Sequence, residues 1–194
     1  MTTPAEFSQL IRKRRTIKPK QMSDREIPRE VLDQLFEDAN WAPTHGLTEP
    51  WRFTVFSGAA RAKLGVFLSD TYKQVMPESG FKQAKFDSFR VNPTLAGAVV
   101  VIGMKRQESG RIPETEEVEA VACAVQNLHL SATAHGLGGF WSSNVAATSD
   151  EMREFVGLAA GDRTLGLFYL GYPNCNWPDG SRQPSADKVT WIDA

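Results

Sequence analysis

Basic side chains are concentrated near the N-terminus, around the run Arg14-Arg15-Thr16-Ile17-Lys18. Six of the chain's 22 Lys and Arg residues fall within positions 12–20. Two guanidinium forks, an ammonium group and a hydroxyl match the oxygens of a phosphate group, which arginine binds in a bidentate manner. The same residues would also suit a solvated helix end, where the helix dipole favours cations. A nucleic-acid contact is a third reading.

A polar loop leads into an aromatic strand in the segment A-P-T-H-G-L-T-E-P-W-R-F, residues 42–53. Two prolines bracket this loop, and loops held between rigid elements often carry binding residues. His45 is therefore a candidate ligand-contacting residue. Taken alone, a histidine in such a loop is more often a surface residue that forms ordinary hydrogen bonds.

Three glycines precede an aromatic pair in the segment G-L-G-G-F-W-S-S, residues 136–143. Glycine lets a backbone come close to a flat group and leaves main-chain N–H groups available. Phe140, Trp141 and Ser142 are therefore candidate binding residues. The alternative is a tight helix-to-strand turn, with both aromatic rings in the core.

Common catalytic signatures are absent from the sequence. It contains no G-x-S-x-G, H-E-x-x-H or C-x-x-C motif and no glycine-rich phosphate loop that ends in Lys-Ser or Lys-Thr. Three histidines, at positions 45, 129 and 135, are too few and too scattered to predict a metal site. We therefore predict no catalytic side chain, because an enzyme without such machinery often relies on a cofactor for its chemistry.

The elements that would position these residues mix helices and strands, which predicts an α+β fold. The first half is predicted to contain a helix from Pro4 with Thr3 as N-cap, a helix from Pro28 to Pro43, a strand over 51–56, a helix over 58–76, and a loop or short helices over 77–93. The helix from Pro28 is amphipathic, with apolar residues at positions 31, 32, 35, 36 and 39.

The second half contains two strongly apolar segments. The run A-V-V-V-I, residues 98–102, predicts a strand covered on both faces. A helix over 114–135 is apolar on nearly every side beyond Glu119, which places it at the centre of the molecule or of a subunit interface. The remaining predictions are a strand over 136–141, a helix from Ser149 to Phe155, a strand over 165–170 and an irregular tail after Tyr172.

Length and composition predict one soluble globular domain over residues 1–194, with 41% hydrophobic and 23% charged residues. The net charge of −1 predicts no general attraction to nucleic acid or to membranes. Two cysteines cannot build a disulfide framework, and no apolar run is long enough to span a bilayer. The N-terminus lacks an apolar signal core, so a cytoplasmic protein is expected.

Four segments in this order resemble the FMN-dependent nitroreductase family, and the similarity extends over essentially the whole chain. They are R-R-T near residue 15, A-P-x-H-x-x-x-x-P-W-R-F from 42, G-L-G-G-F-W-S-S from 136 and L-F-Y-L-G-Y-P from 167 to 173. The resemblance is closest to the small, single-domain branch of NAD(P)H nitroreductases.

The resemblance implies an interlocked homodimer with a central mixed or antiparallel sheet surrounded by helices, and two FMN molecules at the interface. Arg14, Arg15 and Thr16 match positions that hold the FMN phosphate and the adjacent part of the cofactor, and Lys18 of the same basic run is a further candidate for binding FMN. His45 matches a position that contacts the FMN of the partner subunit. The segment 140–142 (Phe140, Trp141, Ser142) matches the one beside the flavin ring.

The implied activity is transfer of two electrons from NADH or NADPH to a small electron-poor acceptor, such as a nitroaromatic or a quinone, in a ping-pong cycle. The alternative is a module that binds flavin without catalysis. Three departures from the family pattern, Trp41, Glu49 and Ser142, bear on FMN affinity and substrate charge. The acceptor, the choice of NADH or NADPH and the role of residues 77–93 do not follow from the sequence.

Overall fold

The computed structural model describes residues 2–23 and 25–193. Its helices are α1 (Pro4–Lys13), α2 (Arg29–Asn40), α3 (Ala60–Val75), α4 (Gln83–Val91), α5 (Glu114–Ala134) and α6 (Asp150–Phe155). Its strands are β1 (Trp51–Ser57), β2 (Ala98–Met104), β3 (Gly138–Ser142) and β4 (Arg163–Gly171). Short 3-10 turns lie at Pro19–Gln21, His45–Leu47, Glu78–Gly80, Asn92–Leu95 and Ala186–Lys188.

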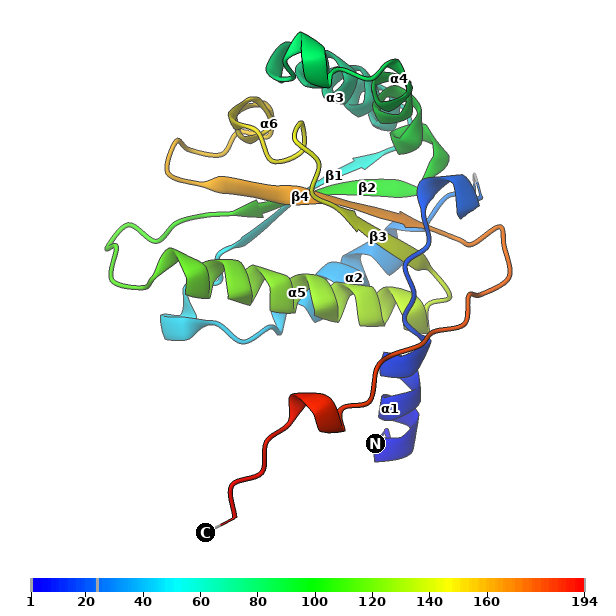
Figure 1. The fold of residues 1–194 in the computed structure, drawn as a ribbon, viewed down its shortest axis with the longest axis vertical. Coiled ribbons are helices and arrows are strands. Elements are labelled where there is room, and N and C mark those ends of the chain that lie inside the picture. Colours follow the sequence, from blue (N-terminus) through cyan, green and yellow to red (C-terminus); the bar gives the residue numbers. More distant parts are fainter. Residues whose placement is uncertain (1, 24, 194) are drawn as a thin grey trace.

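The strands form one antiparallel sheet in the order β1-β2-β4-β3, with helices on both faces (Figure 1). Val100 of β2 lies opposite Val55 of β1 on one side and Phe168 of β4 on the other. The predicted α+β class is thereby confirmed, and all three pairings between these four strands are antiparallel.

Strand β2 is buried along its whole length, which confirms the prediction that both of its faces are covered. Because side chains alternate across a strand, Val100 and Ile102 enter the core formed with α2 and α5. Val99 and Val101 enter the core formed with α3 and α6. Burial of each such side chain contributes about 1.5–3 kcal/mol, so this strand ties the two layers of helices together.

Local sequence signals account for several element boundaries. The Thr3 hydroxyl accepts a hydrogen bond from the Glu6 N–H at the start of α1, and the Ser149 hydroxyl accepts one from Met152 at the start of α6. Both predicted N-caps are confirmed. Residues 77–93 form short helices. They pack on α3 through Phe89, whose ring makes an edge-on contact with Tyr72 at 5.0 Å between ring centroids.

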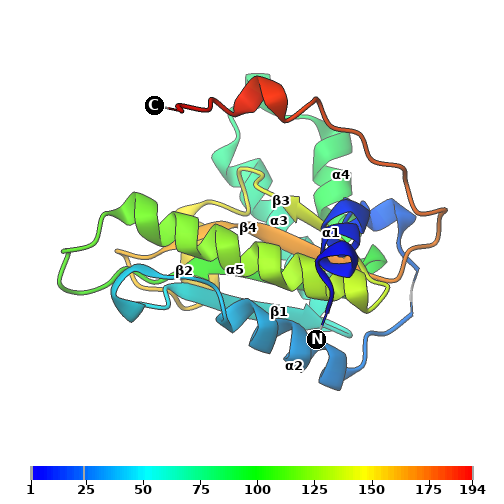
Figure 2. The ribbon, with the colours of Figure 1, turned by 90° about the horizontal axis from the view of Figure 1, so that it is seen from below.

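Helix α5 lies beneath the sheet beside α2, and its C-terminal end comes close to α1 (Figure 2). One side of the helix is buried against the sheet, but Cys123, Gln126 and Ala134 are exposed and Leu130 is only partly covered. Of the two predicted alternatives, a place at the centre of a single chain is therefore wrong. The second alternative, that the exposed side of α5 lies in a subunit interface, remains a proposal.

The tail after β4 is irregular apart from one short turn, as predicted. It passes the C-terminal end of α1, where the Trp177 indole N–H donates to the Lys13 carbonyl oxygen, and then leaves the body of the chain (Figure 1). Trp191 and Ile192 near its end are 81% and 91% exposed, which is unusual for such large apolar side chains. Among the helices that the structure describes, none is long and apolar enough to cross a membrane.

Candidate functional site

The N-terminal basic segment and the glycine-rich segment meet directly. Thr16 and Gly139 form a parallel β-bridge, in which the Ile17 N–H donates to the Gly139 carbonyl oxygen over 3.1 Å. A Cβ at Gly138 would lie 2.4 Å from an Ile17 carbon, and one at Gly139 would lie 2.5 Å from a Phe168 carbon. Two of the glycines are therefore needed because the chain's own side chains come this close.

Arg14, Thr16, Phe140 and Trp141 share one cavity of about 340 Å³, so the structure brings four of the predicted site residues together. Five further residues line this cavity: Ala122, Val125, Gln126, His129 and Phe168. Helix α5 supplies one wall, and β3 with β4 supplies the other. The result is a mainly apolar slot with an arginine among its lining residues.

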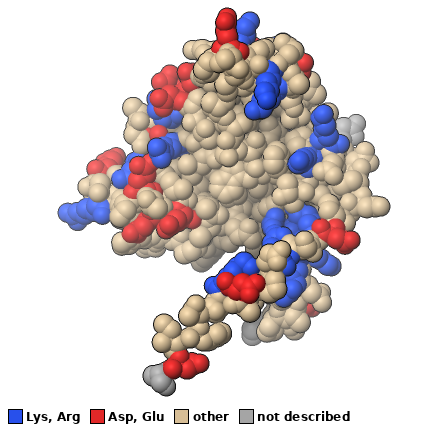
Figure 3. All heavy atoms as spheres, viewed as in Figure 1, with Lys and Arg blue, Asp and Glu red and all other residues tan. Residues whose placement is uncertain are grey.

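A larger cleft of about 750 Å³ shares Arg14 with this cavity, and it also contains Arg12, Arg15 and Arg182. Of the described residues that line it, none is an aspartate or a glutamate. Lys and Arg side chains gather where the tail meets α1 (Figure 3). Burial and the neighbouring Arg182 and Arg15 lower the pKa of Arg14 from its ordinary value. An anion would relieve this repulsion.

The two adjacent arginines have different surroundings. The Arg15 guanidinium donates to the carbonyl oxygens of Pro178 (2.8 Å), Arg12 (2.5 Å) and Arg14 (2.7 Å), so it holds the tail against α1. The Trp177 indole N–H donates to the Lys13 carbonyl and strengthens the same contact. Among the described residues, no hydrogen bond occupies the Arg14 guanidinium, which leaves its fork available to a ligand.

Three predicted residues, Lys18, Ser142 and His45, lie outside both cavities. Lys18 is exposed, and its backbone N–H is bound by Gln21 at the start of a short turn. Ser142 ends β3, and its hydroxyl accepts a hydrogen bond from the Asn144 amide over 3.3 Å. Trp141, which precedes Ser142, does line the smaller cavity, and its indole N–H donates to the Leu165 carbonyl oxygen.

His45 is not brought to the other site residues within one chain. Its Nδ1 lies 2.6 Å from a carboxylate oxygen of Glu116, at the N-terminal end of α5. His129 lies 13 positions further along this helix, which is about 20 Å at 1.5 Å per residue. Leu47 and Glu49 beside His45 have φ values of +54° and +43°, a costly conformation for residues with a Cβ.

His129 and Arg182 line the two cavities of the candidate site, although neither was predicted as a site residue. His129 is 7% exposed, and its Nε2 lies 3.1 Å from the Arg15 carbonyl oxygen. The ring must donate from this nitrogen because a carbonyl can only accept. Nothing local in the sequence distinguishes either residue, since the first is one polar position in an apolar helix and the second lies in an irregular tail.

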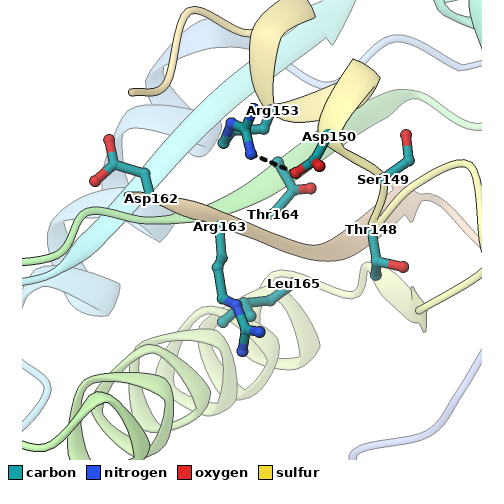
Figure 4. A pocket seen from close by; sticks show the side chains of 8 residues that line it. All are labelled: Thr148, Ser149, Asp150, Arg153, Asp162, Arg163, Thr164 and Leu165. Carbon is teal, nitrogen blue, oxygen red and sulfur yellow. Dashed lines mark hydrogen bonds and ion pairs between the residues drawn. The ribbon is translucent and has the colours of Figure 1, made fainter. Parts of the chain in front are cut away.

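A separate cavity of about 390 Å³ lies by α6 and the start of β4 (Figure 4). Arg153 in its wall is bound by Asp150, and Asp162 also lines it, so it lacks the unopposed positive charge of the arginine cleft. The Thr164 hydroxyl in its wall is buried and has no partner among the described residues. None of the predicted site residues lines this cavity.

The titration of His129 predicts a pH-dependent stability. Burial, together with the Arg14 charge, lowers the pKa of His129 from 6.5 to about 4. Between these two pH values the unfolded chain binds a proton at His129 and the folded chain does not. The stability that neutral His129 contributes is therefore complete above pH 6.5 and is lost as the pH falls toward 4. Between pH 7 and pH 5 we expect a loss on the order of 1–2 kcal/mol in the free energy of unfolding.

Urea unfolding of the wild type and of His129→Gln at both pH values checks this expectation. The variant has no titrating group at position 129, so its stability should fall less than that of the wild type. Equal losses in the two proteins would show that His129 is protonated in the folded chain as readily as in the unfolded one.

Comparison with known proteins agrees with these features. The model of the Nitroreductase family matches residues 11–172. A protein of Escherichia coli (strain K12), YdjA, which carries the provisional name NAD(P)H nitroreductase, is 29% identical over 144 residues, covering 74% of this chain and 76% of its own.

Two solved structures share the fold. A nitroreductase-like family protein from Bacillus cereus has a TM-score of 0.84 at 28% identity, with full coverage of both chains. The FMN-dependent nitroreductase NfnB from Mycobacterium smegmatis, solved in complex with NADPH, has a TM-score of 0.75 at 19% identity, covering 96% of this chain and 98% of its own. Because the family model spans most of the chain, including the N-terminal basic segment and the glycine-rich strand, this protein belongs to the Nitroreductase family.

Proposed function

We propose that this protein is an FMN-dependent NAD(P)H oxidoreductase that reduces small electron-poor acceptors, such as nitroaromatics or quinones, in a two-electron ping-pong cycle. The observation that carries the proposal is the junction of Thr16 with Gly139, which sets an arginine-rich cleft beside a mainly apolar slot. FMN has a matching shape and charge, with a phosphate at one end and a planar ring system at the other.

The arginine cleft fits the phosphate end. Arg14 has an unoccupied fork, and Arg182 lies in the same cleft, so both would bind the phosphate oxygens directly. Arg15 would add its charge while its donors remain on the tail and on α1. Lys18 lies outside the cleft, and we assign it only a contribution to the surrounding positive field.

The apolar slot fits the ring end. Phe140 and Trp141 lie on β3, and Val125 on α5 forms the opposite wall. Main-chain N–H groups near Ser142 would contact the polar edge of a ring bound here. Bound FMN would supply the redox chemistry, whereas this chain's residues orient it, limit the access of water and stabilise negative charge. The exposed Trp41 would border the space for the acceptor.

We further propose that the site is completed by a second copy of the chain. The open side of α5 is small and apolar around Cys123 and Leu130, and such surface is commonly covered by a two-fold interface. His45 lies about 20 Å along α5 from His129, so it would contact the ring bound to the partner. The exposed Trp191 and Ile192 would bury their side chains against that partner.

The phosphate assignment predicts that Arg14→Ala weakens FMN binding by about 1.5–3 kcal/mol, because a charge-assisted hydrogen bond is lost. Titration of flavin fluorescence measures the dissociation constant. Lys20→Ala is the matched control, since Lys20 is an exposed cation of the same segment outside both cavities. Full FMN affinity in folded Arg14→Ala would remove Arg14 from the phosphate site.

The redox assignment predicts that anaerobic NADH or NADPH bleaches the absorbance of the bound flavin and that a quinone or nitroaromatic restores it. Spectra recorded after each addition separate the two halves of the cycle. A flavin that stays oxidised with both nicotinamides would contradict the proposal. Bleaching without turnover on any acceptor would favour the flavin-binding module instead.

The dimer proposal predicts a sedimenting mass about twice the 21.5 kDa of one chain. Cys123→Glu should dissociate it, because a charge would enter an apolar interface without a partner. Lys63→Glu, at an exposed position of α3, is the matched control and should leave the dimer intact. A monomer that still binds FMN fully would refute the shared site.

A further inference from the structure

Few hydrogen bonds hold the backbone from Arg14 to Thr16: the Arg14 N–H donates to the Leu10 carbonyl oxygen, and the Arg14 carbonyl oxygen accepts from the Arg15 guanidinium. Helix α1 ends at Lys13, and Arg14 already has extended dihedral angles of −56° and 126°. The next backbone pairing is at Thr16, where the bridge to Gly139 begins. Between these two points, the backbone direction decides where the Arg14 side chain enters the cleft.

His129 provides a hydrogen bond to this segment from the neighbouring helix. Its Nε2–H donates to the Arg15 carbonyl oxygen over 3.1 Å, and its ring meets Phe168 in an edge-on contact with 5.0 Å between centroids. His129 is almost entirely buried, with an exposed fraction of only 7%. A bond made by a ring held this firmly defines one position for the carbonyl.

The position of the ring depends on a glycine. A Cβ at residue 139 would lie 2.9 Å from Nε2 of His129. Gly139 of β3, which pairs with Thr16, therefore leaves space for the imidazole of His129. Both His129 and Arg14 line the cavity of about 340 Å³, so the ring supports the site from within its wall.

We propose that His129 is a positioning residue for the phosphate site, acting through the Arg15 carbonyl to hold Arg14 in the orientation that binds a phosphate. This inference rests on the proposed FMN site. The His129 ring affects the phosphate end of the site, because it acts through the backbone that orients Arg14. Loss of the ring therefore weakens binding of a phosphorylated flavin more than binding of the same flavin without phosphate.

Two substitutions isolate the hydrogen bond. His129→Gln places an amide N–H where Nε2 lies in the wild type, whereas the amide of His129→Asn is shorter and does not reach the carbonyl. Ser131→Ala is the control on the same helix, because it removes a different hydrogen bond, from Ser131 to Asp38 of α2. Each full-length protein, freed of bound flavin, is titrated with FMN and with riboflavin, and thermal unfolding is followed in parallel.

The measured quantity is the ratio of the riboflavin and FMN dissociation constants, which reports the phosphate contact alone. We expect His129→Asn to lower this ratio about ten-fold, as for one lost hydrogen bond, and His129→Gln to restore most of it. Ser131→Ala should lower the unfolding temperature and leave the ratio unchanged.

The outcomes separate the two proposals. A wild-type preference for FMN that persists in folded His129→Asn would overturn the positioning role and leave the FMN site intact. An equal weakening of both flavins in His129→Asn would also overturn it, because a general loosening of the cavity would then explain the effect. Wild-type protein that binds neither flavin would refute the FMN site itself.

Discussion

The hydrogen bond from the Ile17 N–H to the Gly139 carbonyl joins the N-terminal segment to the sheet, and the candidate site depends on it. Without this junction, Arg14 and Thr16 would have no defined place beside Phe140. Glycine makes the junction possible, because a side chain at position 139 would collide with Phe168 and His129. Packing around one strand thus determines the position of charged groups more than 120 residues away in the chain.

The charge of the site has an energetic consequence. Four arginines line one cleft without a carboxylate among its described residues, so their mutual repulsion opposes folding until an anion binds. Arg15 offsets part of this cost by donating to three backbone carbonyls. Binding of a phosphate would therefore stabilise the chain as well as fill the site, since a ligand that binds only the folded state shifts unfolding.

One chain presents a site that is open on one side. The slot between α5 and β3 has walls and an arginine, but His45 lies at the far end of α5 in a loop with unfavourable backbone angles. Strained and exposed loops of this kind persist where the surrounding structure or a partner holds them. The exposed side of α5 and the tail that extends from the body of the chain also offer surface that a partner would cover. For these reasons we propose a site shared between two chains.

The sequence by itself determined the α+β class, the N-caps at Thr3 and Ser149, the buried strand β2 and the family, because these depend on local periodicity, capping and short motifs. Only the tertiary structure decided the roles of His129 and Arg182. Their positions follow from long-range packing, which brings a helix side chain to the Arg15 carbonyl and a tail arginine to the N-terminus. The tertiary structure likewise gave Arg14 and Arg15 different roles, because a hydrogen bond to the distant tail occupies the Arg15 guanidinium and leaves that of Arg14 available.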